Sequence, residues 1–123
     1  MMFGIGAATR IYLAVGATDM RKSFEGLSGL IREKLSQEPL SGHLFLFCNK
    51  PRNRLKVVFW DGHGLWVCAK RLEKGRFSWP VSGKGEASAA ATIRSEELAM
   101  LLGGIEMART ERKQWWRRNW EES

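Results

Sequence analysis

The stretch SGHLFLFCNKPRNRLKVVFWDGHGLWVCAKRLEKGRFSWP, residues 41–80, decides the fold. It alternates short runs of β-branched, aromatic and aliphatic residues with turn residues, a pattern that predicts strands. The run LFLFC is apolar at every position and predicts a central strand that is buried on both faces. The runs RLKVVFW, LWVCAKR and RFSW follow it, separated by the turn sequences KPRN, DGHG and LEKG. We therefore predict an antiparallel β-meander that ends at Pro80.

The residues before this stretch predict a strand followed by a helix. RIYLAV, residues 10–15, is rich in residues that favour strands. Residues 19–37 then carry apolar side chains at three- and four-residue spacing, which predicts a helix with one buried face. Asp19 suits the N-cap of this helix, and Pro39 stops it.

The residues after Pro80 predict a loop, a second helix and a tail. SGKGEASAAAT, residues 82–92, is small and polar without a period, which is typical of a loop. A helix is expected next, within residues 94–106, with Ser95 as its N-cap. We thus expect a single α+β domain over residues 1–106, an antiparallel β-meander of about four to five strands packed by two helices. Residues 107–123 form a basic, Trp-rich C-terminal tail.

The composition places the chain among small globular proteins. Its 123 residues suit one domain, and 44% of them are hydrophobic. No uncharged apolar run is long enough to span a membrane, and the N-terminus lacks the basic opening of a signal peptide. We therefore expect a cytoplasmic protein. In that compartment Cys48 and Cys68 are expected to be buried free thiols, with a disulfide or a metal site as the alternative.

The positive charge is concentrated in one segment. The chain carries a net charge of +7, and residues 50–76 hold eight Lys or Arg against two acidic residues. Clustering of this kind is typical of proteins that bind polyanions such as nucleic acid. The alternative is a solvated face that keeps the protein soluble.

The residues needed for catalysis are sparse. Asp occurs only as Asp19 and Asp61, and each suits a cap or a turn. A two-metal nuclease or transposase needs several converging carboxylates. His43 and His63 lie twenty residues apart and do not have zinc-motif spacing with the two cysteines. We expect no catalytic site, no metal site and no cofactor.

The hairpin around DGHG sets which cations share a face. Pairing about this turn places Trp60 opposite Leu65, Lys56 opposite Ala69 and Arg54 opposite Arg71. Two like charges directly opposite each other destabilise a sheet. The Arg54–Arg71 pair is explained if an anion lies over it. The alternative is that the two side chains extend into water or pair with Glu73.

Residues 41–80, together with TDMRKSFEGL (18–27) and EELAMLLGGIE (96–106), closely resemble a known family. It is the small bacterial accessory protein called TnpB, encoded by the second reading frame of insertion-sequence-66-type transposons. The elements TDMRK, FWDG, KRLEKGRF and WP occur in the family's order and spacing. The resemblance implies a helper in DNA transposition, encoded beside a small first-frame protein and a transposase that holds the acidic catalytic site.

Two functions are therefore expected to compete. In the first, the protein binds DNA, at the element's ends, through the phosphates; the predicted contacts are Arg52, Arg54, Lys56, Lys70, Arg71, Lys74 and Arg76. In the second, it docks on the transposase or the first-frame protein without DNA contact; the predicted anchors are Trp60, Trp66, Trp115 and Trp116. The sequence does not predict an oligomeric state.

Overall fold

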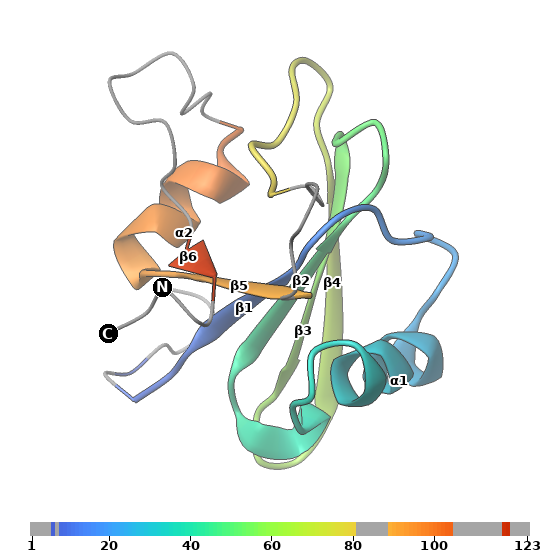
Figure 1. The fold of residues 1–123 in the computed structure, drawn as a ribbon, viewed down its shortest axis with the longest axis vertical. Coiled ribbons are helices and arrows are strands. Elements are labelled where there is room, and N and C mark those ends of the chain that lie inside the picture. The colour runs from blue at the N-terminus through green and yellow to red at the C-terminus, as the bar shows by residue number, and fades with distance from the viewer. Residues whose placement is uncertain (1–5, 7, 81–88, 105–116, 119–123) are drawn as a thin grey trace.

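The strands predicted in residues 44–71 form one half of a mixed β-sheet (Figure 1). The computed structural model describes residues 6, 8–80, 89–104 and 117–118. Along the chain the elements are β1 (Ile11–Ala14), α1 (Phe24–Glu33), the short 3-10 helix η1 (Pro39–Ser41), β2 (Leu44–Cys48), β3 (Arg54–Trp60), β4 (Leu65–Arg71), β5 (Ala90–Ile93), α2 (Ser95–Leu102) and the two-residue β6 (Arg117–Arg118). The α+β class with two helices is confirmed.

The sheet is mostly antiparallel, but it is not a meander throughout. Its strand order is β4-β3-β2-β1-β5-β6. Strands β2, β3 and β4 form the predicted antiparallel hairpins, whereas β1 runs parallel to β2. Parallel neighbours need a long crossover, and residues 15–43 supply it with α1. The central position predicted for LFLFC is confirmed, because all five residues of β2 are buried.

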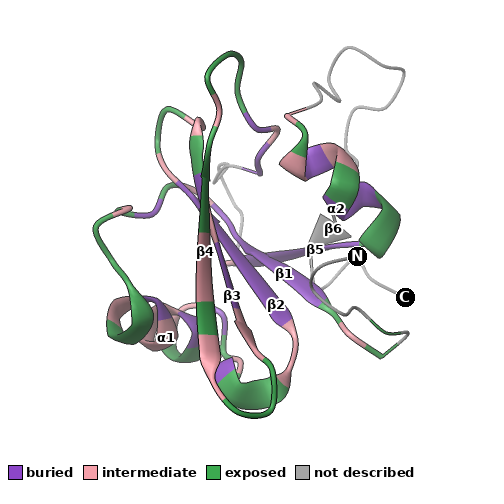
Figure 2. Cartoon of the chain, turned by 180° about the vertical axis from the view of Figure 1, so that it is seen from behind, coloured by how far each residue is buried: buried purple, intermediate pink, exposed green. Residues whose placement is uncertain are grey.

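Helices α1 and α2 lie on opposite faces of the sheet, as Figures 1 and 2 show. One face packs against α1, through a core that includes Tyr12, Leu27 and Phe45. The other face packs against α2, through a core that includes Leu13, Leu46 and Leu98. Because both faces are covered, the central strands can be apolar at every position.

The predicted strand RFSW is wrong. Residues 76–79 form no strand, although Phe77 and Trp79 are 1% and 2% exposed. The Trp79 indole donates a hydrogen bond to the main-chain oxygen of Ala14 at 2.9 Å. The alternation of polar and apolar residues therefore reflects a segment that packs across the end of the sheet without pairing with it.

The predicted start of the first helix is also wrong. Helix α1 begins at Phe24, with Ser23 at the N-cap position, and Asp19 does not cap it. The main-chain N–H of Thr18 donates to the oxygen of Cys48 at 2.8 Å. This bond ties the segment before the helix to the end of β2, so the helix begins later.

The second helix and the strand before it also differ from the prediction. The N-cap of α2 is Arg94 and not Ser95, because the Glu97 carboxylate accepts the main-chain N–H of Arg94 at 2.8 Å. Residues 90–92, predicted as loop, belong to β5, which pairs with β1. All four residues of β5 are buried, and small side chains suit that position. Residues 81–88 and most of the predicted tail lie outside the described residues, although Arg117–Arg118 pair with β5.

Both cysteines are free thiols. Cys48 is buried and Cys68 is half-buried. Burial raises the pKa of the Cys48 thiol to about 12. Among the described residues, no helix has the length and apolar character needed to cross a membrane.

Candidate nucleic-acid interface

The β3–β4 hairpin has the predicted register. Trp60 pairs with Leu65, Lys56 with Ala69, and Arg54 with Arg71. Asp61 closes the turn: its Oδ1 atom accepts the main-chain N–H groups of His63 and Gly64, each at 2.8 Å. These bonds fix the register, and with it the face on which each cation lies.

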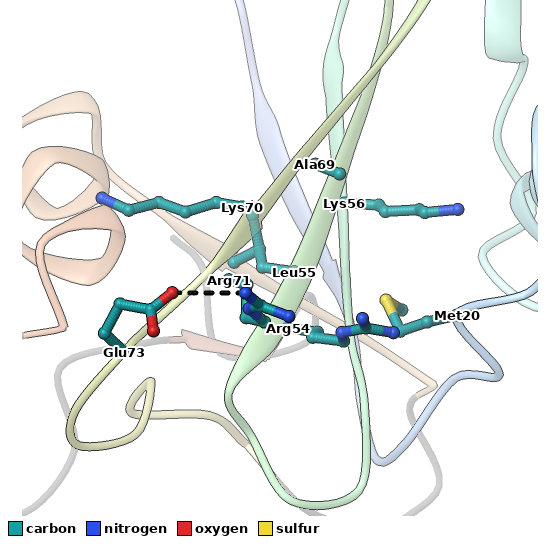
Figure 3. A pocket seen from close by; sticks show the side chains of 8 residues that line it. All are labelled: Met20, Arg54, Leu55, Lys56, Ala69, Lys70, Arg71 and Glu73. Carbon is teal, nitrogen blue, oxygen red and sulfur yellow. Dashed lines mark hydrogen bonds and ion pairs between the residues drawn. The ribbon is translucent and has the colours of Figure 1, made fainter.

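The two opposed arginines line a hollow of about 530 Å³. Figure 3 shows Arg54 and Arg71 next to each other in this hollow, with Met20 on one side. The lining residues are Met20, Arg54, Leu55, Lys56, Ala69, Lys70, Arg71 and Glu73. We call it the hairpin hollow. Four of its residues are basic and one is acidic, so the charge of its lining favours an anion over a cation.

The arginine pair is weakly compensated. An Arg71 Nη2 atom lies 3.5 Å from Glu73 Oε2, and both side chains are more than half exposed. Exposed ion pairs of this length stabilise a protein little. Within the part of the chain that the structure describes, Arg54 forms no ion pair. The pairing with Glu73 that the sequence offered as an alternative is present, but it neutralises one arginine only.

A second hollow of about 480 Å³ adjoins the first, because Met20 and Arg54 line both. It is lined by Ala17, Thr18, Asp19, Met20, Arg21, Asn49, Lys50 and Arg54. We call it the loop hollow. The two hollows together bring six basic side chains against two carboxylates.

Arg21 is held in a fixed orientation in the loop hollow. Its Nε lies 3.1 Å from Asp19 Oδ1, and its Nη2 lies 2.8 Å from Asp19 Oδ2. This pairing lowers the pKa of Asp19 to about 2 and raises the pKa of Arg21. The Arg21 side chain is 91% exposed, so three of its donors stay accessible to a ligand. Neither Arg21 nor Lys50 was among the predicted contacts, although the TDMRK element contains Arg21.

The two lysines of the hairpin leave its plane in opposite directions (Figure 3). Lys56 Nζ donates to the main-chain oxygen of Lys22 at 2.8 Å, and Lys70 Nζ donates to that of Leu102 at 2.7 Å. Lys56 therefore lies on the face of α1, with the arginines. Lys70 lies on the face of α2, and only part of it borders the hairpin hollow.

The other predicted cations lie in loops at the far end of the hairpin. Arg52 is in the β2–β3 turn, in a left-handed conformation with φ of 64°, and its main-chain oxygen accepts the N–H of Phe77 at 2.7 Å. Lys74 and Arg76 are exposed in the loop after β4. These three residues line neither hollow.

The predicted tryptophan anchors differ in accessibility. Trp66 is 51% exposed, whereas Trp60 is half-buried. The Trp66 indole stacks on Phe59 with ring centroids 5.9 Å apart, and its Nε1 donates to Asp61 Oδ2 at 2.8 Å. Trp66 is therefore both exposed and held in place. Trp115 and Trp116 lie outside the described residues.

Among described residues, no group of three or more His, Cys, Asp or Glu is arranged to hold a metal ion.

Comparison with known proteins identifies the family. The family described as "IS66 Orf2 like protein" matches residues 9–112. The chain belongs to this family. The resemblance seen in the sequence is thereby confirmed, and the match extends beyond the last predicted helix into the tail. Membership assigns the chain to the accessory proteins of transposable elements of this type.

Two curated relatives come from Sinorhizobium fredii (strain NBRC 101917 / NGR234). "Uncharacterized protein y4hO" is 39% identical over 105 residues, covering 85% of this chain and 88% of the relative. "Uncharacterized protein y4jC" is 33% identical over 112 residues, covering 91% of this chain and 92% of the relative. No solved structure matches the chain significantly.

Proposed function

We propose that this chain is a non-catalytic accessory factor for the transposition of an insertion-sequence-66-type element, and that it binds the element's DNA in the bacterial cytoplasm. The DNA backbone lies over the hairpin hollow and the loop hollow. Its phosphates contact Arg21, Lys50, Arg54 and Arg71. The partners are the element's transposase and its small first-frame protein.

One observation carries this proposal: Arg54 and Arg71 face each other across two strands. Like charges in this position are destabilising unless an anion neutralises them, and Glu73 supplies only a long, exposed contact. A guanidinium group binds a phosphate through paired N–H···O bonds, so each arginine of the pair can take one phosphate of the DNA backbone. The adjoining loop hollow continues the positive surface, as contact with successive phosphates requires.

Contact with phosphates makes binding depend on salt. Each phosphate that is neutralised releases counterions, so log K falls with log salt at a slope of roughly −0.9 per contact. Four contacts predict a slope of about −3.6 for duplex DNA carrying the element's ends. Such contacts position a protein on DNA and read little of the base sequence.

The test replaces the opposed arginines. Arg54→Gln with Arg71→Gln should make the salt slope shallower by about 2, because two contacts are lost. The same double variant should melt at an equal or slightly higher temperature, since a like-charge pair is removed. Arg21→Gln should make the slope shallower by about 1. DNA titrations at several salt concentrations and melting curves measure the two effects separately.

The matched control is Arg32→Gln, which removes an exposed cation that lines neither of these hollows. For this variant, the slope of log K for DNA binding against log salt should equal that of the unmodified protein. An unchanged slope in the double variant would contradict the proposed face. Absence of DNA binding at low salt, alone and with the transposase, would favour the second function.

The second function is docking on the transposase without DNA contact. The exposed and ordered Trp66 favours it, because a rigid aromatic side chain loses little entropy when a partner covers it. Docking through Trp66 would resist added salt, which distinguishes it from phosphate binding.

A further inference from the structure

The strand β4 forms one edge of the sheet. In the described part of the chain it pairs with β3 alone, over seven consecutive residue pairs. The pairing is one-to-one from Leu65 to Arg71, so the strand contains no bulge, and it contains no proline. Bulges and prolines are devices by which natural proteins protect an edge strand from pairing further.

The hairpin hydrogen bonds show which backbone groups of β4 face outward. At the turn the Asp61 N–H donates to Gly64, and at the open end the Leu72 N–H donates to Asn53. In an antiparallel pair, hydrogen-bonded and non-bonded positions alternate. The backbone groups of Trp66, Cys68 and Lys70 therefore point toward β3. The backbone groups that point away from the sheet are those of Leu65, Val67, Ala69 and Arg71.

The side chains along this edge divide it into two halves. Near the turn lie Leu65 and Trp66, and Trp66 is the exposed aromatic side chain that Phe59 and Asp61 hold in place. At the open end lie Lys70 and Arg71, both exposed, and β4 contains no acidic residue. The edge thus offers free backbone groups, an apolar half and a cationic half.

We propose that the edge of β4 binds an extended segment of a partner protein, which adds to the sheet as a further antiparallel strand. Backbone hydrogen bonds to the four outward-facing residues would supply affinity, as in other cases of strand addition. Charge complementarity selects a segment that is acidic where it passes Lys70 and Arg71 and apolar where it passes Leu65 and Trp66. In antiparallel addition the acidic residues precede the apolar ones.

Charge also decides against a second copy of this chain as the occupant. Its β4 strand would bring two further cations and no carboxylate, and it lies within the segment that carries most of the net positive charge. Two such edges lack charge complementarity. Arg71 also lines the hairpin hollow, but the outward-facing backbone groups of β4 take no part in phosphate binding, so the proposal stands whether or not the protein binds DNA.

The test uses a labelled peptide that alternates Glu and Thr over its first four residues, and Val and Thr over its next four. It should bind the full chain, and binding should protect the amides of Val67 and Ala69 from hydrogen exchange at least tenfold, as NMR measures. The amides of Cys68 and Lys70 are already bonded to β3 and should change little. A peptide with Lys in place of Glu should bind at least tenfold more weakly.

A proline at position 69 tests the same surface by mutation. Ala69→Pro removes an N–H that faces away from the sheet, a change that edge strands tolerate. It should weaken peptide binding at least tenfold while the circular dichroism spectrum stays the same. Ala69→Thr keeps the N–H and should bind as the unmodified protein does.

Four outcomes would overturn the proposal. The first is that the acidic peptide does not bind. The second is that it binds without protecting Val67 and Ala69. The third is that these amides become protected as protein concentration rises without peptide, which would assign the edge to a second copy. The fourth is that a single-stranded oligonucleotide protects them equally well. The hydrogen-exchange measurement needs no variant, so it decides the matter even if Ala69→Pro fails to fold.

Discussion

The Asp61 carboxylate accepts three hydrogen bonds within the β3–β4 hairpin. The dipeptide Asp-Gly between two apolar runs indicates a hairpin turn, and the side-chain bonds to His63 and Gly64 confirm that role. The third bond, from Trp66 Nε1 to Asp61 Oδ2, was not predicted. It depends on the orientation of an indole five residues away, which strand periodicity alone does not specify.

These three bonds lower the pKa of Asp61 to about 2, the indole bond first among them. A carboxyl group whose pKa is lower in the folded state stabilises the protein above its unfolded pKa, near 4. That stabilisation is lost as the pH falls from about 4 to 2.

Asp61→Ala should therefore lower the melting temperature at neutral pH by roughly 4 °C, because the turn loses its acceptor. The difference from the unmodified protein should shrink as the pH falls from 4 to 2. Asp61→Asn keeps one acceptor oxygen and should melt between the two. Melting curves over this pH range measure all three proteins. An unchanged melting temperature together with lost transposition would mark Asp61 as a functional residue instead.

At the scale of elements, prediction succeeded where periodicity was strong and local. The runs LFLFC, RLKVVFW and LWVCAKR became β2, β3 and β4, and the register of the last two was set by one turn. It failed at β5, where three small residues and Ile93 pair with a strand about 80 positions earlier. Such long-range pairing leaves no local signal in the sequence.

The residues of the candidate site likewise fall into those that local sequence predicts and those that it does not. Arg54, Lys56 and Arg71 follow from hairpin register, and the structure brings them together on one side of the sheet. Arg21 reaches the same region only because the segment after β1 is tied to the end of β2. That contact spans about 30 residues and depends on the parallel β1–β2 pair, which the sequence did not reveal.

The packing of the segment after β4 gives a prediction at this scale. Trp79→Phe removes the buried hydrogen bond to Ala14 and part of the indole volume, so the free energy of unfolding should fall by about 2 kcal/mol. Trp66→Phe loses an indole hydrogen bond at an exposed position and should lose less than half as much. Chemical denaturation measures both variants. Equal losses would show that the Trp79 bond contributes no more than an exposed one.

At the scale of the whole molecule, the two surfaces use different parts of one hairpin. The α1 side of β3 and β4 carries the opposed arginines, whereas the outer edge of β4 carries free backbone groups. Apart from Arg71, which both proposed surfaces use, the hairpin offers different groups to DNA and to a partner segment. That arrangement suits the proposed accessory factor, which would bring the element's DNA and its transposase together.

The last prediction tests whether this chain cleaves DNA by itself. The two aspartates have structural partners: Asp19 pairs with Arg21, and Asp61 is bonded within the hairpin turn. Glu97 is 2% exposed and accepts the N–H of Arg94 at the start of α2. Carboxylates engaged in this way are poorly placed to bind the paired metal ions of a DNA-cutting enzyme.

Purified protein with Mg²⁺ or Mn²⁺ should therefore neither nick nor join duplex DNA that carries the element's ends, as a supercoiled-plasmid assay measures. Adding the transposase should supply the cleavage. Asp61→Asn serves as the decisive variant, because it removes the charge and keeps an acceptor for the turn. Metal-dependent cleavage by this chain alone that disappears in Asp61→Asn would overturn the accessory function.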